Sequence, residues 1–218
     1  SIALSMISDD SFYMEMKKDY APEMVTAFIR LNGATVGCVA NRSEVYTDGE
    51  KTATYDAALT AAGCEKAAAF VNFCNAFEIP VLTLVNVDGY KNCKCNEKKI
   101  AKAAARLTYA FANADVPKVT VVVGKANGTA GLTMNSKSIG SDIVYAWKNA
   151  KIGVMEAAPA VKIMYADEIA KADNAAALIN EKAAQYNEMQ ASALAAAKRG
   201  YVDDIIEASE TRQRVVAA

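Results

Sequence analysis

The sequence VTVVVGKANGTAG, from Val119 to Gly131, begins as an almost unbroken β-branched run and ends in a loop with three glycines. Such a run is typical of a strand that is buried on both faces. Glycine has no Cβ and can adopt positive φ, so a loop of this kind lets a ligand approach the backbone closely. Backbone N–H groups at the start of a following helix can then converge on an anion. We therefore expect the functional site at the end of this strand.

The same loop also fits an ordinary strand-to-helix turn without a ligand, and both interpretations remain open at this point. It is not a phosphate-binding loop, because the Gly-Lys-Ser/Thr ending is missing. It also lacks the GxGxxG pattern followed by a suitably spaced acidic residue that dinucleotide-binding proteins use.

The chain contains no histidine among its 218 residues. This excludes Ser–His–Asp and Cys–His catalysis and any zinc site with a histidine ligand. If the protein is an enzyme, another base, the substrate or a cofactor must move the proton. Backbone groups that stabilise an oxyanion would then be the main contribution of the protein.

Composition restricts the partners and the compartment. Hydrophobic residues make up 53% of the chain and the net charge is −1, so we expect a sizeable core and no nucleic-acid partner. No apolar run reaches the roughly 18 residues of a membrane span. The chain begins with Ser1 and not with methionine, which suggests a piece of a longer polypeptide without a signal peptide.

Five cysteines, an odd number, are scattered along the chain and favour a reducing, cytoplasmic location. Cys93 and Cys95 form a CxC pair in a charged loop, but the further ligands that a metal needs are not clustered with them. We therefore expect two free surface thiols and no metal. Cys74 is expected to pack in the core.

Periodicity and turn residues predict the order of the elements. Asn32-Gly33 is the strongest hairpin signal in the chain. The predicted elements are strands at 24–31 and 35–40, a helix at 57–77, a strand at 79–87, a helix at 97–114, a strand from 119, a helix at 133–148, a strand at 150–155, Ala-rich helix at 168–198 and a last helix from about 209.

The chain also resembles itself. The segments around Pro80 and Pro117 are similar and lie about 37 residues apart, which predicts a repeated strand–helix unit with parallel strands. The carboxyl ends of parallel strands meet at one edge of a sheet, where ligands gather. Asp88-Gly89-Tyr90 should therefore lie beside the Gly128 loop, although an ordinary turn is also compatible with this segment.

Several blocks, in order along the chain, resemble the carboxyltransferase subunits of biotin-dependent acyl-CoA carboxylases and decarboxylases. Residues 200–212, GYVDDIIEASETR, are similar to the C-terminal signature of these subunits. Further similar blocks lie at 28–41, 70–80, 107–121, 125–130 and 145–155. The resemblance covers only the C-terminal half of such a subunit. It implies that residues 1–218 form a single C-terminal carboxyltransferase domain and that the N-terminal half of the family is absent.

This resemblance implies an α/β fold of the crotonase-like type, a spiral of ββα units with C-terminal helices, which agrees with the repeat. It also implies an oligomer with a site shared between an N-terminal half, which holds the acyl-CoA, and a C-terminal half of a partner, which holds biotin. The biotin is attached to a biotin carboxyl carrier protein. In this chemistry carboxybiotin releases CO2, the ureido nitrogen takes the α-proton of the acyl-CoA, and the enolate attacks CO2.

The resemblance implies roles for individual residues. The backbone amides of Thr129 and Ala130 would form the oxyanion hole that faces the biotin carbonyl. The segment Gly89-Tyr90 and the residues Gly128, Gly131 and Leu132 would line the biotin and substrate site. No metal is implied.

The chain departs from the family pattern at the site. The family reads Gly-Gly-Ala-Tyr-Asp where this chain has Gly128-Thr129-Ala130-Gly131-Leu132, and Leu132 in place of the acid predicts a changed acyl-chain preference. Asp88 replaces a proline, and Lys98-Lys99 and Lys102-Ala103 replace Gly-Gly and Arg-His.

Three functions are therefore compatible with the sequence. The first is a carboxyltransferase component that is inactive as an isolated half. The second is a non-catalytic half that serves assembly. The third is a crotonase-fold hydrolase or isomerase that acts on an acyl-CoA without biotin.

Overall fold

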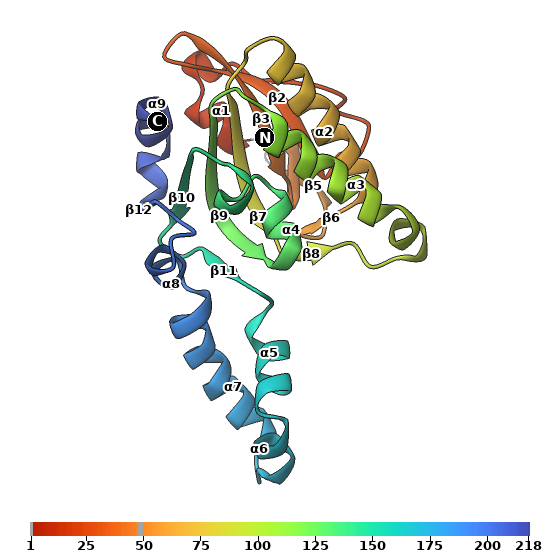
Figure 1. Cartoon of the computed structure of the whole chain (residues 1–218), viewed down its shortest axis with the longest axis vertical. Helices are drawn as coiled ribbons and strands as arrows, with labels where there is room; N and C mark the ends of the chain where they lie inside the picture. The colour runs from red at the N-terminus through yellow and green to blue at the C-terminus, as the bar shows by residue number, and fades with distance from the viewer. Residues whose placement is uncertain (1, 48–49) are drawn as a thin grey trace.

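A twisted β-sheet forms the centre of the protein in the computed structural model, which describes residues 2–47 and 50–218. The strand order is β1-β2-β3-β7-β9-β10-β12, with β1, β2 and β3 antiparallel and the following neighbours parallel (Figure 1). These strands are β1 (Met14–Glu15), β2 (Met24–Leu31), β3 (Ala34–Asn41), β7 (Val81–Val87), β9 (Lys118–Asn127), β10 (Ile143–Trp147) and β12 (Asp204–Ile206).

The predicted hairpin is confirmed. Strands β2 and β3 pair in register from Met24 with Asn41 to Leu31 with Ala34. Asn32 and Gly33 between them have φ of 52° and 84°, as a tight two-residue hairpin turn requires. A further hairpin, β4 (Glu44–Thr47) with β5 (Glu50–Thr54), follows β3.

The internal repeat corresponds to the sheet register. Val81 of β7 lies beside Lys118 of β9, so the two similar segments occupy neighbouring parallel strands. Short strands precede α2, α3 and α5: β6 (Ala58–Leu59) and β8 (Gly89–Tyr90) pair with each other outside the main sheet, and β11 (Lys151–Gly153) pairs with the end of β9 within it. This gives the expected ββα order of the crotonase-like spiral.

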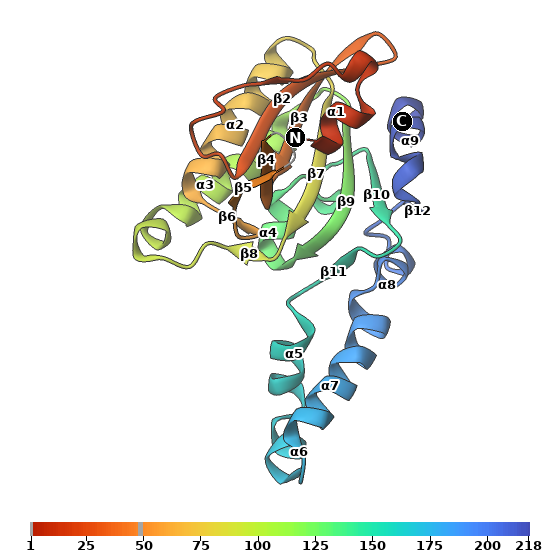
Figure 2. The same ribbon diagram turned by 180° about the vertical axis from the view of Figure 1, so that it is seen from behind.

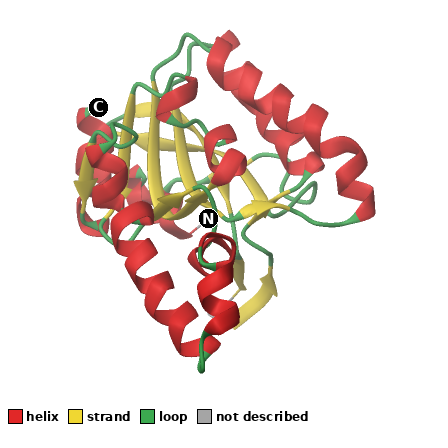
Figure 3. Ribbon diagram, turned by 60° about the horizontal axis from the view of Figure 1, so that its bottom comes forward, coloured by secondary structure: helices red, strands yellow, loops and turns green. Residues whose placement is uncertain are grey.

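Helices cover both faces of the sheet (Figures 2 and 3). Helices α2 (Ala61–Ala76) and α3 (Lys94–Asn113) pack against each other and close one face with buried side chains such as Leu107 and Phe111. Helix α1 (Ile2–Ile7) and helix α9 (Thr211–Ala217) lie over the opposite face, where Leu4 and Val215 join its apolar cluster. We call the sheet with these four helices the sheet body.

The helix predicted at 133–148 is wrong. The chain there forms the short helix α4 (Gly128–Thr133), a 3-10 turn η2 (Lys137–Ile139) and strand β10. Gly140, with φ of 102°, ends the turn in a left-handed conformation. The following IVYAW segment then pairs with β9 and β12, because β-branched and aromatic side chains fit a buried parallel strand.

The Ala-rich region is helical as predicted, but most of it leaves the sheet body. Helices α5 (Ala157–Met164), α6 (Ala166–Lys171) and α7 (Ala175–Tyr186) project away from the sheet, and we call residues 157–186 the arm (Figures 1 and 2). The chain returns through a π-helical turn η3 (Asn187–Ala191), α8 (Ala193–Lys198) and, after β12, the 3-10 turn η4 (Ala208–Glu210).

Gly200, with φ of 79°, follows α8 as the predicted C-terminal stop. None of the helices within residues 2–47 and 50–218 combines the length and the hydropathy that a membrane span requires.

Candidate functional site

The glycine-rich loop forms the N-terminus of α4 at the carboxyl end of β9. Gly128 has φ of 57°, and a Cβ there would lie 3.0 Å from the carbonyl oxygen of Val154. Thr129 and Ala130 follow within the first helical turn, with Thr129 exposed and Ala130 buried. Amides of the first turn have no acceptor within their own helix and lie at the positive end of its dipole. The loop therefore presents backbone donors, as the sequence predicts.

Gly131 holds α4 close to β9. A Cβ at this position would lie 2.7 Å from the carbonyl carbon of Ala126, a distance that real side chains do not reach. Because the clash is with backbone, a larger residue at 131 would displace α4 and its amides. The absence of a side chain at Gly131 is therefore part of the geometry that places Thr129 and Ala130.

An ionic cluster lies directly beside this loop. Lys125 Nζ lies 2.7 Å from Asp88 Oδ2 and also forms an ion pair with Glu156, which precedes α5. Asn127 Nδ2 donates to Asp88 Oδ1 at 2.7 Å. The cluster joins the ends of β7 and β9 to the start of the arm.

The cluster shifts the pKa values of Asp88 and Lys125 in opposite directions. Partial burial alone would raise the pKa of Asp88, but the hydrogen bonds donated by Lys125 and Asn127 and the charge of Lys125 leave the pKa below its usual value. The pKa of Lys125 is raised, chiefly by its hydrogen bonds with Asp88 and Glu156. The sequence placed Asp88 at this edge, but no local signal indicated that Lys125 and Glu156 would join it.

Gly89 and Tyr90 lie at the same edge as the Gly128 loop, as predicted. The Tyr90 hydroxyl and Thr133 Oγ1 are 3.0 Å apart, so β8 is joined by a hydrogen bond to α4. Gly89 and Tyr90 are both half-buried. Neither Gly89 nor Tyr90 lines the cavity that opens at the Gly128 loop, so the structure places them beside that cavity.

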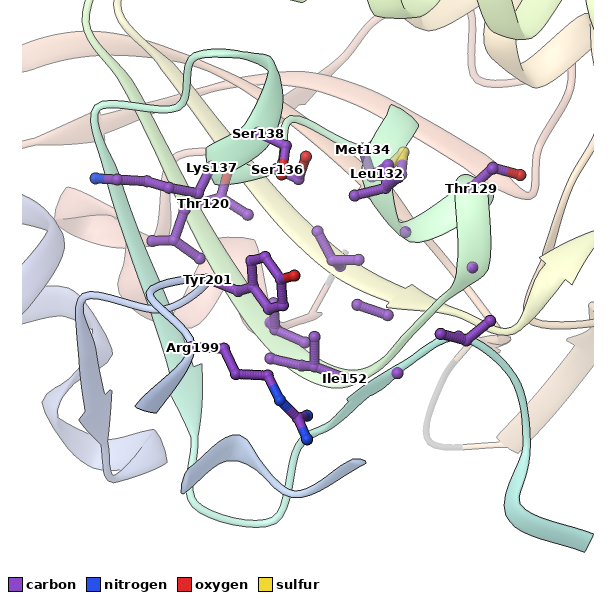
Figure 4. A pocket seen from close by; sticks show the side chains of 18 of the residues that line it. Thr120, Thr129, Leu132, Met134, Ser136, Lys137, Ser138, Ile152, Arg199 and Tyr201 are labelled. Carbon is purple, nitrogen blue, oxygen red and sulfur yellow. The ribbon is translucent and has the colours of Figure 1, made fainter. Parts of the chain in front are cut away.

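A cavity of about 820 Å³ opens between α4, the β9–β11 strands and the segment that returns from the arm. Gly128, Thr129, Gly131 and Leu132 line it, whereas Ala130 does not. Figure 4 shows Arg199 and Tyr201 on the side opposite Leu132. The cavity also contacts β9 through Thr120 and Val122, β11 through Ile152 and Gly153, and the end of the arm through Tyr186.

Two cations at this cavity were not recognised in the sequence as site residues. Arg199 caps α8, and its Nη1 donates to the carbonyl oxygen of Gln190 at 2.8 Å. Lys137 Nζ lies 2.8 Å from Asp203 Oδ2. Both side chains are positively charged and suit an anionic group. The sequence signal that could have indicated Arg199 is its place just before Gly200, whose φ is positive.

Asp203 is structural. Its Oδ2 accepts a hydrogen bond from the Val144 backbone N–H at 2.8 Å in addition to the Lys137 contact. Burial would raise the pKa of Asp203, but Lys137 and the Val144 amide outweigh it and lower the pKa. Within the described ranges, no group of three or more His, Cys, Asp and Glu side chains is arranged to hold a metal ion.

Comparison with known proteins identifies the family. The family model described as "Carboxyl transferase domain" matches residues 3–218. The chain belongs to the carboxyl transferase domain family. It is 38% identical over 216 residues to the methylmalonyl-CoA carboxyltransferase 12S subunit of Propionibacterium freudenreichii subsp. shermanii, covering 99% of this chain and 40% of the relative. It is also 38% identical over 222 residues to methylmalonyl-CoA decarboxylase subunit alpha of Propionigenium modestum, again 99% of this chain and 40% of the relative.

The fold comparison agrees with the family. A crystal structure of transcarboxylase 12S, described as a hexamer assembly with hydrolysed methylmalonyl-coenzyme A bound, matches with a TM-score of 0.90 and 39% identity. The match covers 99% of this chain and 40% of that one. The crotonase-like fold expected from the sequence is therefore confirmed, and the chain spans about 40% of the length of these relatives.

Proposed function

We propose that this chain is the C-terminal half of the carboxyltransferase component of a biotin-dependent acyl-CoA carboxylase or decarboxylase. It would bind biotin through the backbone amides of Thr129 and Ala130. The observation that carries the proposal is the N-terminus of α4, tightly seated on β9, at the mouth of a cavity of about 820 Å³. The family and the names of the relatives support the reaction class.

The residues present fit a neutral ureido ring on a flexible tether. Two amides at a helix N-terminus can donate to one carbonyl oxygen and stabilise the negative charge that develops on it. Gly128 and Gly131 let the backbone approach, and Leu132 and Ile152 supply apolar walls. Carrier-bound biotin supplies the carboxyl group and a nitrogen base, so this half needs no histidine.

Activity in this proposal requires partners. Residues 1–218 would form one C-terminal carboxyltransferase domain, and an acyl-CoA-binding half and a biotin carboxyl carrier protein would complete the reaction. The arm exposes large apolar side chains, and the related transcarboxylase 12S forms a hexamer, so we propose that this chain assembles into an oligomer. All five cysteines are free, which supports a reducing, cytoplasmic location.

The test is Ala130→Pro in the natural full-length protein with its partners. Proline removes one amide donor while its φ suits the first turn of a helix. Loss of one oxyanion donor is expected to lower turnover about 100- to 1,000-fold. Ala175→Pro, in the first turn of α7 within the arm, is the matched control and should leave turnover unchanged.

The outcomes separate the three candidate functions. Unchanged turnover by a folded Ala130→Pro variant would remove the oxyanion assignment. Turnover that persists when avidin sequesters the biotin would favour a biotin-independent crotonase enzyme. An assembled wild-type complex without turnover, while holding a biotinylated partner, would favour a scaffold role.

A further inference from the structure

Two thiols face each other on the turn that precedes α3, outside the site described above. Cys93 is the residue before the helix and Cys95 lies in its first turn. Their Sγ atoms are 3.0 Å apart, closer than two sulfur atoms in ordinary contact. Cys93 is half-buried and Cys95 is exposed, so both are accessible to small molecules.

Hydrogen bonds fix both ends of this turn. The Lys91 backbone N–H donates to the Leu59 carbonyl at 2.9 Å. The buried Asn96 side chain donates to the Lys91 carbonyl at 2.7 Å and accepts from the Ala61 amide at 2.7 Å. The segment between Lys91 and Asn96 is therefore held in a shape that keeps the sulfurs together. The Sγ atoms must close from 3.0 Å to the S–S bond length of about 2.05 Å.

The two thiols differ in acidity. The pKa of Cys93 is lowered, first by the hydrogen bond with Cys95, then by the nearby backbone amide of Asn96, and also by the charge of Lys91. The pKa of Cys95 is raised, mainly because it donates to Cys93. Because the thiolate is the nucleophile, Cys93 is the more reactive partner and Cys95 is placed to resolve its products.

The other cysteines lack these properties. Cys38, Cys64 and Cys74 are buried, and burial raises the pKa of all three, to about 12 for Cys64 and Cys74. They act as internal controls, because they should stay reduced while the protein is folded.

We propose that Cys93 and Cys95 form a reversible modification site that a hydroperoxide converts into an intramolecular disulfide. The Cys93 thiolate attacks one peroxide oxygen, the O–O bond breaks, and water or an alcohol leaves as Cys93 becomes a sulfenic acid. The Cys95 sulfur then attacks the Cys93 sulfur and water leaves, so the two thiols lose two electrons in total and the peroxide gains them. An external thiol attacks one sulfur and opens the ring to a mixed disulfide with one free cysteine, and a second thiol then displaces the first as an external disulfide, so both cysteines return to thiols and the two external thiols are oxidised.

The position of the pair gives the modification a structural consequence. Cys93 lies three residues after Tyr90, whose hydroxyl is hydrogen-bonded to Thr133 of α4. A disulfide would therefore restrain the chain beside the loop that carries Thr129 and Ala130. Any effect on carboxyl transfer rests on the proposed function, whereas disulfide formation does not.

The experiment treats the folded 218-residue chain with hydrogen peroxide, alkylates the remaining thiols and measures the intact mass. Before alkylation the oxidised chain should be lighter by about 2 Da, the mass of two hydrogens, and after alkylation it should carry two alkyl groups fewer than the untreated chain; dithiothreitol should reverse both differences. Trypsin cleavage after Lys94 should then yield the peptides 92–94 and 95–98 joined by a disulfide. Cys93→Ser should abolish this species, and Cys95→Ser should leave a Cys93 sulfenic acid that dimedone traps.

Several results would overturn the proposal. These are an unchanged mass under conditions that oxidise a free thiol peptide, disulfides that form only between chains, or direct oxidation to sulfinic acid without the intramolecular disulfide. Circular dichroism of both serine variants checks that the fold is retained. Cys74→Ser, which keeps the exposed pair, is the control: its mass change on oxidation should equal that of the wild type.

Discussion

The helices of the sheet body and the helices of the arm differ in how much they bury: α2 and α3 each place apolar side chains in the core beside the sheet, whereas α6 and α7 have no buried residue. Phe111 and Leu107 of α3 are completely buried against the sheet. In the arm, Ile163 and Met164 at the end of α5 are 69% and 59% exposed. The comparison shows that this chain stabilises its sheet through its own core, while most of the arm contributes little burial. The edge that we propose to be functional lies at the junction of the two regions, where Lys125 joins Asp88 to Glu156.

The largest effect is expected in the core of the sheet body. Phe111→Ala removes a completely buried aromatic side chain and should lower the free energy of unfolding by about 3–5 kcal/mol. Tyr109→Ala, on the same helix but 68% exposed, should change it by less than about 0.5 kcal/mol. Urea denaturation of both variants measures the difference, and equal losses would mean that α3 does not pack as described.

The next effect concerns a buried ion pair that holds the edge strand β1. Arg42 Nη2 lies 2.6 Å from Glu15 Oε1, both side chains are 6% exposed, and Tyr13 donates to Glu15 at 2.7 Å. Burial would raise the pKa of Glu15, but the hydrogen bonds from Arg42 and Tyr13 outweigh it and leave the pKa lowered. A lowered folded-state pKa stabilises the protein above the unfolded-state value of ~4.3, and this contribution is lost as pH falls through the folded-state value.

Glu15→Gln should therefore cost about 1–3 kcal/mol at pH 7, because the buried guanidinium loses its counter-charge. The deficit relative to wild type should shrink as the pH falls below the usual glutamate range, since the wild-type carboxylate is then protonated too. Thermal or urea unfolding at neutral and acidic pH measures it. A deficit that stays constant down to acid pH would show that the charge of Glu15 is not the cause.

The sequence predicts the sheet body well for physical reasons that are local. The β-branched run after Val119 favours a buried strand. Asn32 and Gly33 readily adopt the positive φ angles that their two-residue turn requires. The repeat around Pro80 and Pro117 even indicates the register of β7 against β9. The segment from Val119 to Gly131 also predicts the loop at Gly128.

Tertiary context decided what the sequence could not predict. The segment from Ile143 to Trp147 became a strand because β9 and β12 offered partners on both sides. The Asp88–Lys125–Glu156 cluster joins residues far apart in the chain, and the place of Arg199 opposite Leu132 depends on the return path of the chain from the arm. None of these contacts leaves a local pattern, so only the structure reveals them.

An effect of similar size is expected where α4 meets β9, close to the junction with the arm. Gly131→Ala would place a Cβ 2.7 Å from the Ala126 carbonyl carbon, and the forced shift should cost about 1–3 kcal/mol. Gly89→Ala is the matched control, because its added Cβ meets nothing within 4 Å and its φ is not positive. Its cost should stay below that of Gly131→Ala, as urea denaturation can measure. Equal stabilities would mean that α4 is not held by this close contact.

A last pair of substitutions tests the contrast within the arm itself. Val161 and Ile163 lie on the same helix, α5, but Val161 is completely buried and Ile163 is 69% exposed. Val161→Ala should lower the free energy of unfolding by about 1–3 kcal/mol, whereas Ile163→Ala should change it by less than about 0.5 kcal/mol in the unassociated chain. Denaturation at several protein concentrations separates this result from association. A loss for Ile163→Ala that grows with concentration would show that a second molecule covers the arm, because association stabilises the folded state by mass action.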